Sequence, residues 1–367
     1  MREPYATTTD ATAPSRMIAP NSNRPRKGNR PPKGRSMPIN VCVLGDRAYY
    51  ERILPSNPYL ASEHCLFLGR AATNDEVVSA MPDTEVLLVD AIATVDADLI
   101  GRLPRLKLIN SEGVAYDKID LACARDHGVF VCNNHGMNAG AVAEQTVLLM
   151  LGLLRGVVEG DAAVRGGRQM EVKMRGMREG ITDLADCTVG LVGLGAIGQA
   201  TATRLRAFGC RVLYTGRTRK EAALEQELGV EYLPLEQMLP QCDFVSLHCA
   251  VTPQTRNLVD ASFLAQMRPD ACLINTARGE VVDNEALVDA LIGGHLGGAG
   301  LDVVYPEPVL PDNPLLNLPE EAARKVLFSP HVGGITTGSM RRGQAHMWEN
   351  VTRVERGERP DCVVNGL

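Results

Sequence analysis

The sequence lacks any long apolar run. Its 367 residues are 45% hydrophobic, yet none of its stretches approaches the 18 or more apolar residues that a membrane span requires. The region after Met1 also lacks the apolar core of a secretory signal. These absences predict a cytoplasmic protein without a membrane partner. A chain of this length exceeds what a single core usually fills, so we expect two domains.

Paired cysteines are also missing. The ten cysteines are scattered along the chain, and no two of them form a C-x-x-C pair. This pattern favours reduced, mostly buried thiols over a disulfide framework, and we expect no metal site.

Acidic residues are scarce at the N-terminus. Residues 1–36 hold eight lysines or arginines and two acids, so their net charge is +6. Because the whole chain has a net charge of −6, the remaining residues together carry −12. An acidic body argues against nucleic acid as a partner. The first 36 residues are rich in proline, glycine and asparagine, and we expect them to form a disordered basic extension.

Short apolar runs with helical stretches between them make up the remainder. The first series of predicted strands occupies 39–45, 85–90, 106–110 and 129–133. The second series occupies 188–195, 211–216, 244–249, 272–277, 298–304 and 326–331. Near-continuous apolar strands are typical of a parallel sheet covered on both faces. A long apolar helix is predicted from Asn138 to Gly160 between the two series, and the last helix, 339–358, is expected to return to the first domain.

A glycine motif opens the second series. Gly193, Gly195 and Gly198 form G-x-G-x-x-G directly after a predicted strand and before an amphipathic helix. The first glycine allows a tight turn, the second lets the backbone approach a pyrophosphate, and the third permits close packing of helix and strand. The helix N-terminus then faces the anion with unpaired N–H groups. The motif therefore predicts a dinucleotide site.

The acid that usually selects NAD is absent. An NAD site carries Asp or Glu about 20 residues after the glycine motif, but here Gly216 ends the second strand and Arg217, Thr218 and Arg219 follow it. No carboxylate repels a 2′-phosphate, and arginine forks can bind one. We expect NADP to be preferred, with NAD still possible; a solvated basic turn is the alternative interpretation.

Three polar residues follow apolar strands of the second series: Arg278, Glu307 and His331. Ligands of open α/β sheets bind outside the carboxyl ends of the strands, so these side chains are expected to share one crevice.

Several stretches together resemble the D-2-hydroxyacid dehydrogenase family. They are "AVAEQTVLLMLGLLR", "GLVGLGAIGQATATRLRAFG", "HCAVTPQTRNLV", "LINTARGEVVDNEAL", "GAGLDVVYPEP" and "SPHVGG". They follow the family's order from about residue 39 to the C-terminus. The segment "YTGR" is similar to the cofactor motif of NADP-using glyoxylate and hydroxypyruvate reductases within that family.

The resemblance implies an α/β fold of two Rossmann-like domains, each a doubly wound parallel sheet, with a cleft between them. It places a substrate-binding, catalytic domain at 37–138 and 335–367 and a dinucleotide-binding domain at 139–334. It also implies a homodimer.

The resemblance assigns the three strand-end residues to catalysis. Arg278 would bind the substrate carboxylate and polarise the 2-oxo group, His331 would be the acid and base, and Glu307 would lie beside the imidazole. Reduction of a 2-oxo acid needs a proton on the carbonyl oxygen as hydride reaches the carbon, and histidine can carry that proton near neutrality. A neighbouring carboxylate favours the protonated imidazole with which reduction starts.

By the same resemblance, Asp302 lies near the nicotinamide carboxamide. The further residues expected at the cofactor are Thr276, Ala277, Ala196, Ile197, Ala250, Thr255 and Gly333. The loop 110–120 would hold the substrate carboxylate with backbone N–H groups of Gly113, Val114 and Ala115.

The leading hypothesis is a 2-oxo acid reductase that transfers hydride between NADPH (or NADH) and a small acid such as glyoxylate or hydroxypyruvate. A nucleotide-sensing binding protein that resembles the C-terminal-binding-protein corepressors is the alternative from another class. Phosphite or formate dehydrogenases of the same fold are a further alternative. A phosphoglycerate dehydrogenase with an appended regulatory domain is disfavoured, because the sequence ends soon after the last helix.

Overall fold

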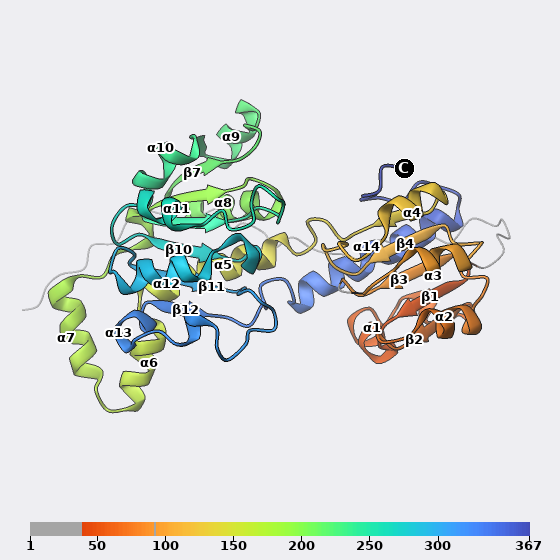
Figure 1. The fold of residues 1–367 in the computed structure, drawn as a ribbon, viewed down its shortest axis with the longest axis horizontal. Helices are drawn as coiled ribbons and strands as arrows, with labels where there is room; N and C mark the ends of the chain where they lie inside the picture. The colour runs from red at the N-terminus through yellow and green to blue at the C-terminus, as the bar shows by residue number, and fades with distance from the viewer. Residues whose placement is uncertain (1–38, 92) are drawn as a thin grey trace, which may run out of the picture. The chain divides into compact units, whose positions relative to one another are not determined.

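Two parallel sheets form the framework of the protein (Figure 1). The computed structural model describes residues 39–91 and 93–367. The predicted basic extension, 1–36, lies outside the described residues. Parallel sheets and intervening helices confirm the predicted α/β class.

The first sheet has the strand order β2-β1-β3-β4-β5, in which every neighbouring pair is parallel. Its strands are β1 (Val41–Leu44), β2 (Cys65–Leu68), β3 (Val86–Val89), β4 (Leu108–Ser111) and β5 (Phe130–Cys132). The order reverses beside β1, as in doubly wound folds. Its helical segments are α1 (Arg47–Ile53), η1 (Pro58–Ala61), α2 (Asn74–Ala80), α3 (Ala97–Arg102), α4 (Leu121–Asp126) and α14 (Thr337–Glu355).

The last helix, α14, packs on this first sheet although it follows the second sheet in sequence. It contacts α1 and β4, and its Met347, Trp348 and Val351 are buried in one cluster with Tyr50. The Trp348 ring also stacks on Tyr59 with centroids 5.4 Å apart. Apolar burial thus joins the C-terminal helix to the N-terminal strands.

The second sheet has the order β12-β11-β10-β9-β6-β7-β8, again entirely parallel. Its strands are β6 (Thr188–Val192), β7 (Arg211–Thr215), β8 (Val230–Tyr232), β9 (Phe244–Leu247), β10 (Cys272–Asn275), β11 (Gly298–Leu301) and β12 (Val326–Phe328). The order reverses beside β6, with β7 on one side and β9 on the other. Such a switch point is where open α/β sheets bind ligands.

Helices cover both faces of the second sheet. Successive residues of β10 belong to different cores, Leu273 to one with α11 and α12 and Ile274 to one with α5 and α8. The helices here are α5 (Ala139–Leu154), α6 (Val157–Arg165), α7 (Gln169–Glu179), α8 (Ala196–Phe208), α9 (Ala222–Leu228), α10 (Leu235–Met238), α11 (Ala261–Gln266), α12 (Asn284–Ile292) and α13 (Glu320–Ala323). Four short 3₁₀ segments are η2 (Leu184–Asp186), η3 (Leu239–Gln241), η4 (Gly279–Val281) and η5 (Pro314–Leu316). The two-sided burial expected from apolar strands is confirmed.

The structure corrects two details of the sequence prediction. The helix expected from Asn138 to Gly160 ends at Leu154, because Gly156 adopts φ 54° and starts a new helix, α6. Glycine reaches this left-handed region without a steric penalty, so it commonly ends helices. The sequence prediction also omitted two short edge strands, the wholly apolar β2 and the weakly apolar β8.

All ten cysteines are free thiols, as the sequence predicted. Across 39–91 and 93–367, no helix has both the length and the apolar character needed to cross a membrane.

Candidate active site

The glycine motif forms the turn between β6 and α8. Gly193 has φ 105°, and a methyl group there would lie 2.7 Å from the carbonyl oxygen of His248. A methyl group on Gly198 would collide with the carbonyl of Gly193. Gly195, in contrast, faces open space, and a methyl group added to it would have no atom within 4 Å. Two glycines therefore permit close packing, and the third leaves room for a ligand.

The N-terminus of α8 fits the pyrophosphate of a dinucleotide. The first intrahelical hydrogen bond runs from Gln199 N–H to Gly195 at 2.9 Å, so the N–H groups of Ala196, Ile197 and Gly198 precede it. No side chain caps this helix end. Unpaired N–H groups beside an open glycine make an anion site.

The turn lies at the switch point of the second sheet. Gly193 N–H donates to the Thr215 carbonyl at 2.9 Å, and His248 N–H donates to the Val192 carbonyl at 2.9 Å. The ends of β6, β7 and β9 are therefore held together around the glycine turn. His248 is a residue that sequence reasoning missed, although it follows a buried strand as the three predicted catalytic residues do. Burial lowers its pKa to about 4, which keeps the imidazole neutral at neutral pH.

The basic turn after β7 contains two arginines, one exposed and one paired with an acid. The Arg217 side chain is exposed and has no ion-pair partner among the described residues. Arg219 donates through Nε and Nη2 to the carboxylate of Glu225 at 2.9 and 2.8 Å and lies over the Tyr232 ring. The hydroxyl of Tyr214 donates to the same carboxylate at 2.6 Å. Sequence reasoning treated the two arginines alike, but Arg219 ties the turn to α9 and Arg217 is free.

The Glu225 carboxylate is a strong anchor for this turn. Hydrogen bonds from Arg219 and then from Tyr214 lower its pKa to about 2. It therefore stays ionised at neutral pH and holds Arg219 in place. Thr218, between the arginines, is exposed, and no atom lies within 4 Å of a methyl position on Gly216.

The catalytic candidates follow three neighbouring strands, β10, β11 and β12. Arg278 ends a turn that the buried side chain of Asn275 shapes. The Asn275 Oδ1 accepts from Ala277 N–H at 3.0 Å, and its Nδ2 donates to the Arg278 carbonyl at 2.9 Å. Arg278 itself donates through Nη1 to the Ala277 carbonyl at 2.7 Å. Thr276 is buried and shares a hydroxyl hydrogen bond of 2.9 Å with Thr146 of α5.

Glu307 and His331 meet directly. The Nδ1 of His331 lies 2.6 Å from Oε1 of Glu307, and 40% of the imidazole remains exposed. A carboxylate can only accept, so Nδ1 carries the proton and Nε2 is the atom left to exchange a proton with a ligand. The predicted neighbourhood of acid and imidazole is therefore present in the structure.

Asp302 clamps the loop that carries His331. Its buried carboxylate accepts from Ser329 Oγ at 2.5 Å and from the N–H groups of Val332 at 3.0 Å and Gly333 at 2.9 Å. His331 has φ 55°, a left-handed conformation that non-glycine residues rarely adopt. Both oxygens of Asp302 thus hold this loop, and its expected place near the nicotinamide carboxamide stays a prediction. A methyl group on Gly333 would lie 2.9 Å from Asp302 Oδ2, which explains the glycine.

The two weaker cofactor candidates, Ala250 and Thr255, contact each other. The Thr255 hydroxyl donates to the Ala250 carbonyl at 2.6 Å and accepts from the N–H of Thr252 at 2.7 Å. These bonds close the loop after β9. The hydroxyl of Thr255 is thus occupied within the loop.

The predicted substrate loop follows β4, and three of its carbonyls accept hydrogen bonds within the protein. The Gly113 carbonyl accepts from Asn134 N–H at 2.8 Å, the Val114 carbonyl from Asn133 Nδ2 at 2.7 Å, and the Ala115 carbonyl from Ser111 Oγ at 2.7 Å. In a trans peptide the N–H points opposite to the C=O.

The N–H groups of Val114 and Ala115 therefore point away from these side chains, and neither has an acceptor in the described part of the chain. Two adjacent free donors suit a carboxylate. Asn133 and Asn134, which sequence reasoning missed, orient them.

Comparisons with known proteins identify the family to which the chain belongs. The family model described as D-isomer specific 2-hydroxyacid dehydrogenase, NAD binding domain, matches residues 147–333. Glyoxylate reductase of Korarchaeum cryptofilum is 37% identical over 289 residues, which cover 79% of this chain and 85% of that protein. The chain belongs to the D-isomer specific 2-hydroxyacid dehydrogenase family. As a member of this family it is an oxidoreductase that uses a nicotinamide cofactor on 2-hydroxy acids.

Two further relatives show how much of the chain the similarity covers. D-3-phosphoglycerate dehydrogenase of Mycobacterium tuberculosis is 37% identical over 290 residues, 79% of this chain but only 53% of that protein. Among solved structures, protein TT0316 of Thermus thermophilus has a TM-score of 0.71 at 33% identity, with 88% of this chain and 99% of that chain covered. The two-sheet fold of the dehydrogenase is therefore shared along most of the described chain.

Proposed function

We propose that this dehydrogenase reduces a small 2-oxo acid of the glyoxylate or hydroxypyruvate type and prefers NADPH. The observation that carries the proposal is the contact between His331 and Glu307. His331 lies on the loop that Asp302 holds, and Arg278 follows another strand of the same sheet. The relative named glyoxylate reductase, which this chain matches over most of its length, supports the substrate class.

The chain's own residues divide the chemistry. The nicotinamide, when bound, supplies the hydride. His331 gives the proton on Nε2 to the carbonyl oxygen, and Glu307 stabilises the charged imidazole before the transfer. Arg278 binds the substrate carboxylate and polarises the carbonyl, because its fork presents several donors at once.

The substrate carboxylate also needs donors from the first sheet. We assign that task to the free N–H groups of Val114 and Ala115, with Gly113 permitting the turn. A methyl group on Gly113 would lie 2.5 Å from the Ala91 side chain, so the loop depends on glycine there. In this proposal residues 37–138 and 335–367 form the substrate domain and residues 139–334 bind the cofactor.

The cofactor preference rests on the turn after β7. Position 216 holds glycine where an NAD site would hold an acid. The exposed Arg217, unpaired among the described residues, is available to a 2′-phosphate. Thr215, two residues before Arg217, accepts a hydrogen bond from Gly193 of the glycine turn, so the ribose end of a dinucleotide would lie within reach of Arg217. NADPH should accordingly bind more tightly than NADH.

We also propose a homodimer that covers α5, α6 and α7. Helix α7 has no buried residue, which an isolated subunit does not explain. The large apolar side chains exposed on and after these helices are Leu148, Val157, Val158, Val164, Met170, Met174, Met177 and Ile181. Such a concentration is typical of an interface.

A substrate screen with both cofactors tests the function. Purified enzyme is mixed with NADPH or NADH and with glyoxylate, hydroxypyruvate or 3-phosphohydroxypyruvate, and the loss of nicotinamide absorbance is recorded. We expect the highest kcat/KM for glyoxylate or hydroxypyruvate with NADPH, and its loss in His331→Gln. A preference for the phosphorylated acid would favour the phosphoglycerate dehydrogenase relationship.

Parallel assays in which phosphite or formate is mixed with the oxidised cofactor test the other enzymatic alternatives. Tight NADPH binding without turnover of any of these compounds would contradict the proposal and favour a nucleotide-sensing binding protein.

A further inference from the structure

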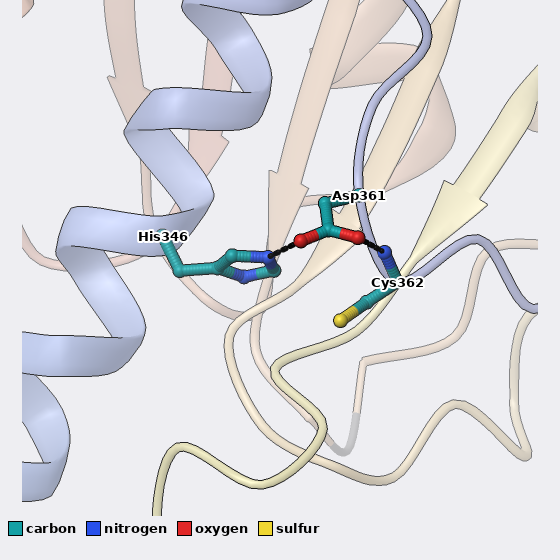
Figure 2. Close-up of side chains that lie close together, drawn as sticks. All are labelled: His346, Asp361 and Cys362. Carbon is teal, nitrogen blue, oxygen red and sulfur yellow. Dashed lines mark hydrogen bonds and ion pairs between the residues drawn. The ribbon is translucent and has the colours of Figure 1, made fainter.

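The segment after α14 folds back beside that helix and places two polar side chains next to a histidine (Figure 2). Asp361 and Cys362 lie in this segment, and His346 projects from α14. The side chain of Asn350 donates to the Asp361 carbonyl at 3.2 Å and accepts from the Asp361 N–H at 2.8 Å. Val364 N–H donates to the Val131 carbonyl at 2.8 Å, which attaches the segment to β5. The backbone under the two side chains is therefore well anchored.

A hydrogen bond to Asn134 fixes the orientation of the His346 ring. The Nδ1 of His346 lies 2.8 Å from Oδ1 of Asn134, whose Nδ2 donates to the Glu112 carbonyl at 2.6 Å. That second bond turns the amide oxygen toward the histidine, so Nδ1 must be the donor and Nε2 carries the lone pair. An N–H donated to a fixed acceptor is the usual arrangement behind a metal-ligating histidine.

The Nε2 of His346 is buried and has no hydrogen-bond partner among the residues that the structure describes. The side chain is only 10% exposed, and the facing Oδ2 of Asp361 is 4.0 Å away, beyond hydrogen-bond reach. A buried lone pair without a donor is costly unless a cation meets it.

We propose that His346, Asp361 and Cys362 bind a thiophilic divalent cation of the zinc type, with a fourth position left for water. One ligand atom from each side chain, an imidazole nitrogen, a carboxylate oxygen and Sγ, lies within 4.8 Å of the other two. Bonds of about 2.0–2.3 Å at tetrahedral angles place ligand atoms about 3.3–3.8 Å apart. The site therefore closes by about 1 Å on binding, and the 62% exposed side chain of Asp361 is free to make that move.

The ligand set selects the kind of cation. A thiolate, an imidazole and one carboxylate suit zinc and similar soft or borderline ions, whereas magnesium and calcium prefer oxygen ligands. Cys362 is a free thiol, whose sulfur carries one proton. When the sulfur–metal bond forms, this proton leaves to solvent and no atom changes oxidation state.

The site departs from the sequence expectation, which treated all ten cysteines as non-ligands because no C-x-x-C pair exists. His346 lies 15 residues before Asp361, and only the return of the chain brings them together. A bound ion would join the C-terminal segment to α14 and, through Asn134, to the backbone of the proposed substrate loop.

Cobalt(II) is the probe that tests the site. Full-length protein freed of metal with a chelator is titrated with Co²⁺, and absorption is recorded from the near ultraviolet to the visible. We expect one Co²⁺ per chain, a thiolate-to-cobalt charge-transfer band, strong visible bands of a tetrahedral ion, and displacement by Zn²⁺. Binding should raise the midpoint of thermal unfolding, with saturation at one ion per chain.

Two variants examine the ligands. Cys362→Ser should abolish the charge-transfer band and weaken Co²⁺ binding at least tenfold. Asp361→Asn keeps the shape and the oxygen that accepts from the Cys362 N–H at 2.9 Å; it should keep the band but weaken binding. Asp361 is exposed, so this variant tests the site even when the cysteine variant fails to fold.

Cys123→Ser is the matched control. Cys123 also lies beside a histidine, with Sγ 3.6 Å from Nδ1 of His127, but no carboxylate completes a group of three there. Its Co²⁺ spectrum and affinity should equal those of the unaltered protein. An unchanged charge-transfer band in Cys362→Ser, its loss in Cys123→Ser, or no Co²⁺ bound at millimolar concentration would each overturn the proposal.

Discussion

Replacement of Arg217 by alanine separates recognition of the cofactor phosphate from the structure of the turn. The Arg217 side chain is exposed and unpaired in the described chain, so its removal leaves no buried group without a partner. Arg219 differs, because its loss would leave the buried Glu225 with only the Tyr214 hydroxyl. Arg217→Ala therefore reports on the cofactor, whereas Arg219→Ala mixes binding with folding.

The size of the effect follows from the bonds at stake. A hydrogen bond to a charged group contributes about 1.5–3 kcal/mol, and about 1.4 kcal/mol corresponds to a tenfold change in Kd. One arginine contact to the 2′-phosphate is thus worth about 10- to 100-fold in the Kd of NADPH. NADH has no 2′-phosphate, so its Kd should change by less than about fivefold, which corresponds to the roughly 1 kcal/mol upper range of an exposed charge interaction.

The assay is a titration of each protein with NADPH and with NADH, followed by cofactor fluorescence, and a comparison of kcat/KM for one acid with both cofactors. Arg211→Ala is the matched control, because Arg211 is an exposed arginine at the opposite end of β7 and pairs with Glu231. It removes the same charge from the other end of β7 and should leave both Kd values unchanged. Equal losses for NADPH and NADH in Arg217→Ala, or an equal loss in the control, would refute phosphate recognition by this side chain.

Three further predictions concern buried or catalytic groups. His331→Gln should lower kcat about 100-fold or more, the usual contribution of a general acid, while the Kd of NADPH is unchanged; retained turnover would remove His331 from the proton transfer. Because burial lowers the pKa of His248 to about 4, its contribution to the free energy of unfolding is complete above pH ~6.5 and is lost by up to about 3 kcal/mol as the pH falls to about 4. Urea unfolding of the unaltered protein and of His248→Gln across that range measures the loss, and parallel curves would contradict it. Burial raises the pKa of Glu112, so the folded state resists its ionisation; Glu112→Gln should unfold at higher urea than the unaltered protein at pH 7 but not at pH 4, and an equal difference at both would exclude this cause.

Much of the active site could be predicted because its residues belong to local patterns. The glycines of the turn from β6 to α8 stand in one short motif, although the backbone that crowds Gly193 belongs to His248. Apolar strands likewise indicate where Arg278, Glu307 and His331 follow. The supporting residues were not predictable in this way. Asn275 resembles any polar strand end, and the use of Asp302 as a clamp depends on Val332 and Gly333, about 30 residues away.

Sequence periodicity also failed where the deciding residue was a single glycine or a weak edge strand. The apolar pattern of α5 resumes at Val157 after only Arg155 and Gly156, and the left-handed conformation of Gly156 separates the two helices. Edge strands such as β8 bury few side chains, so their pattern lacks the contrast on which prediction depends.

By itself the sequence determined the α/β class, the dinucleotide motif, the family and the three strand-end candidates, because each depends on short-range order or on runs of apolar residues. Only the tertiary structure decided which of the two arginines after β7 is free, what holds the His331 loop, and which backbone donors near Gly113 lack acceptors. It also brought His346 to Asp361 and Cys362. These features depend on contacts between segments distant in sequence, and burial and hydrogen-bond partners exist only once the chain has folded.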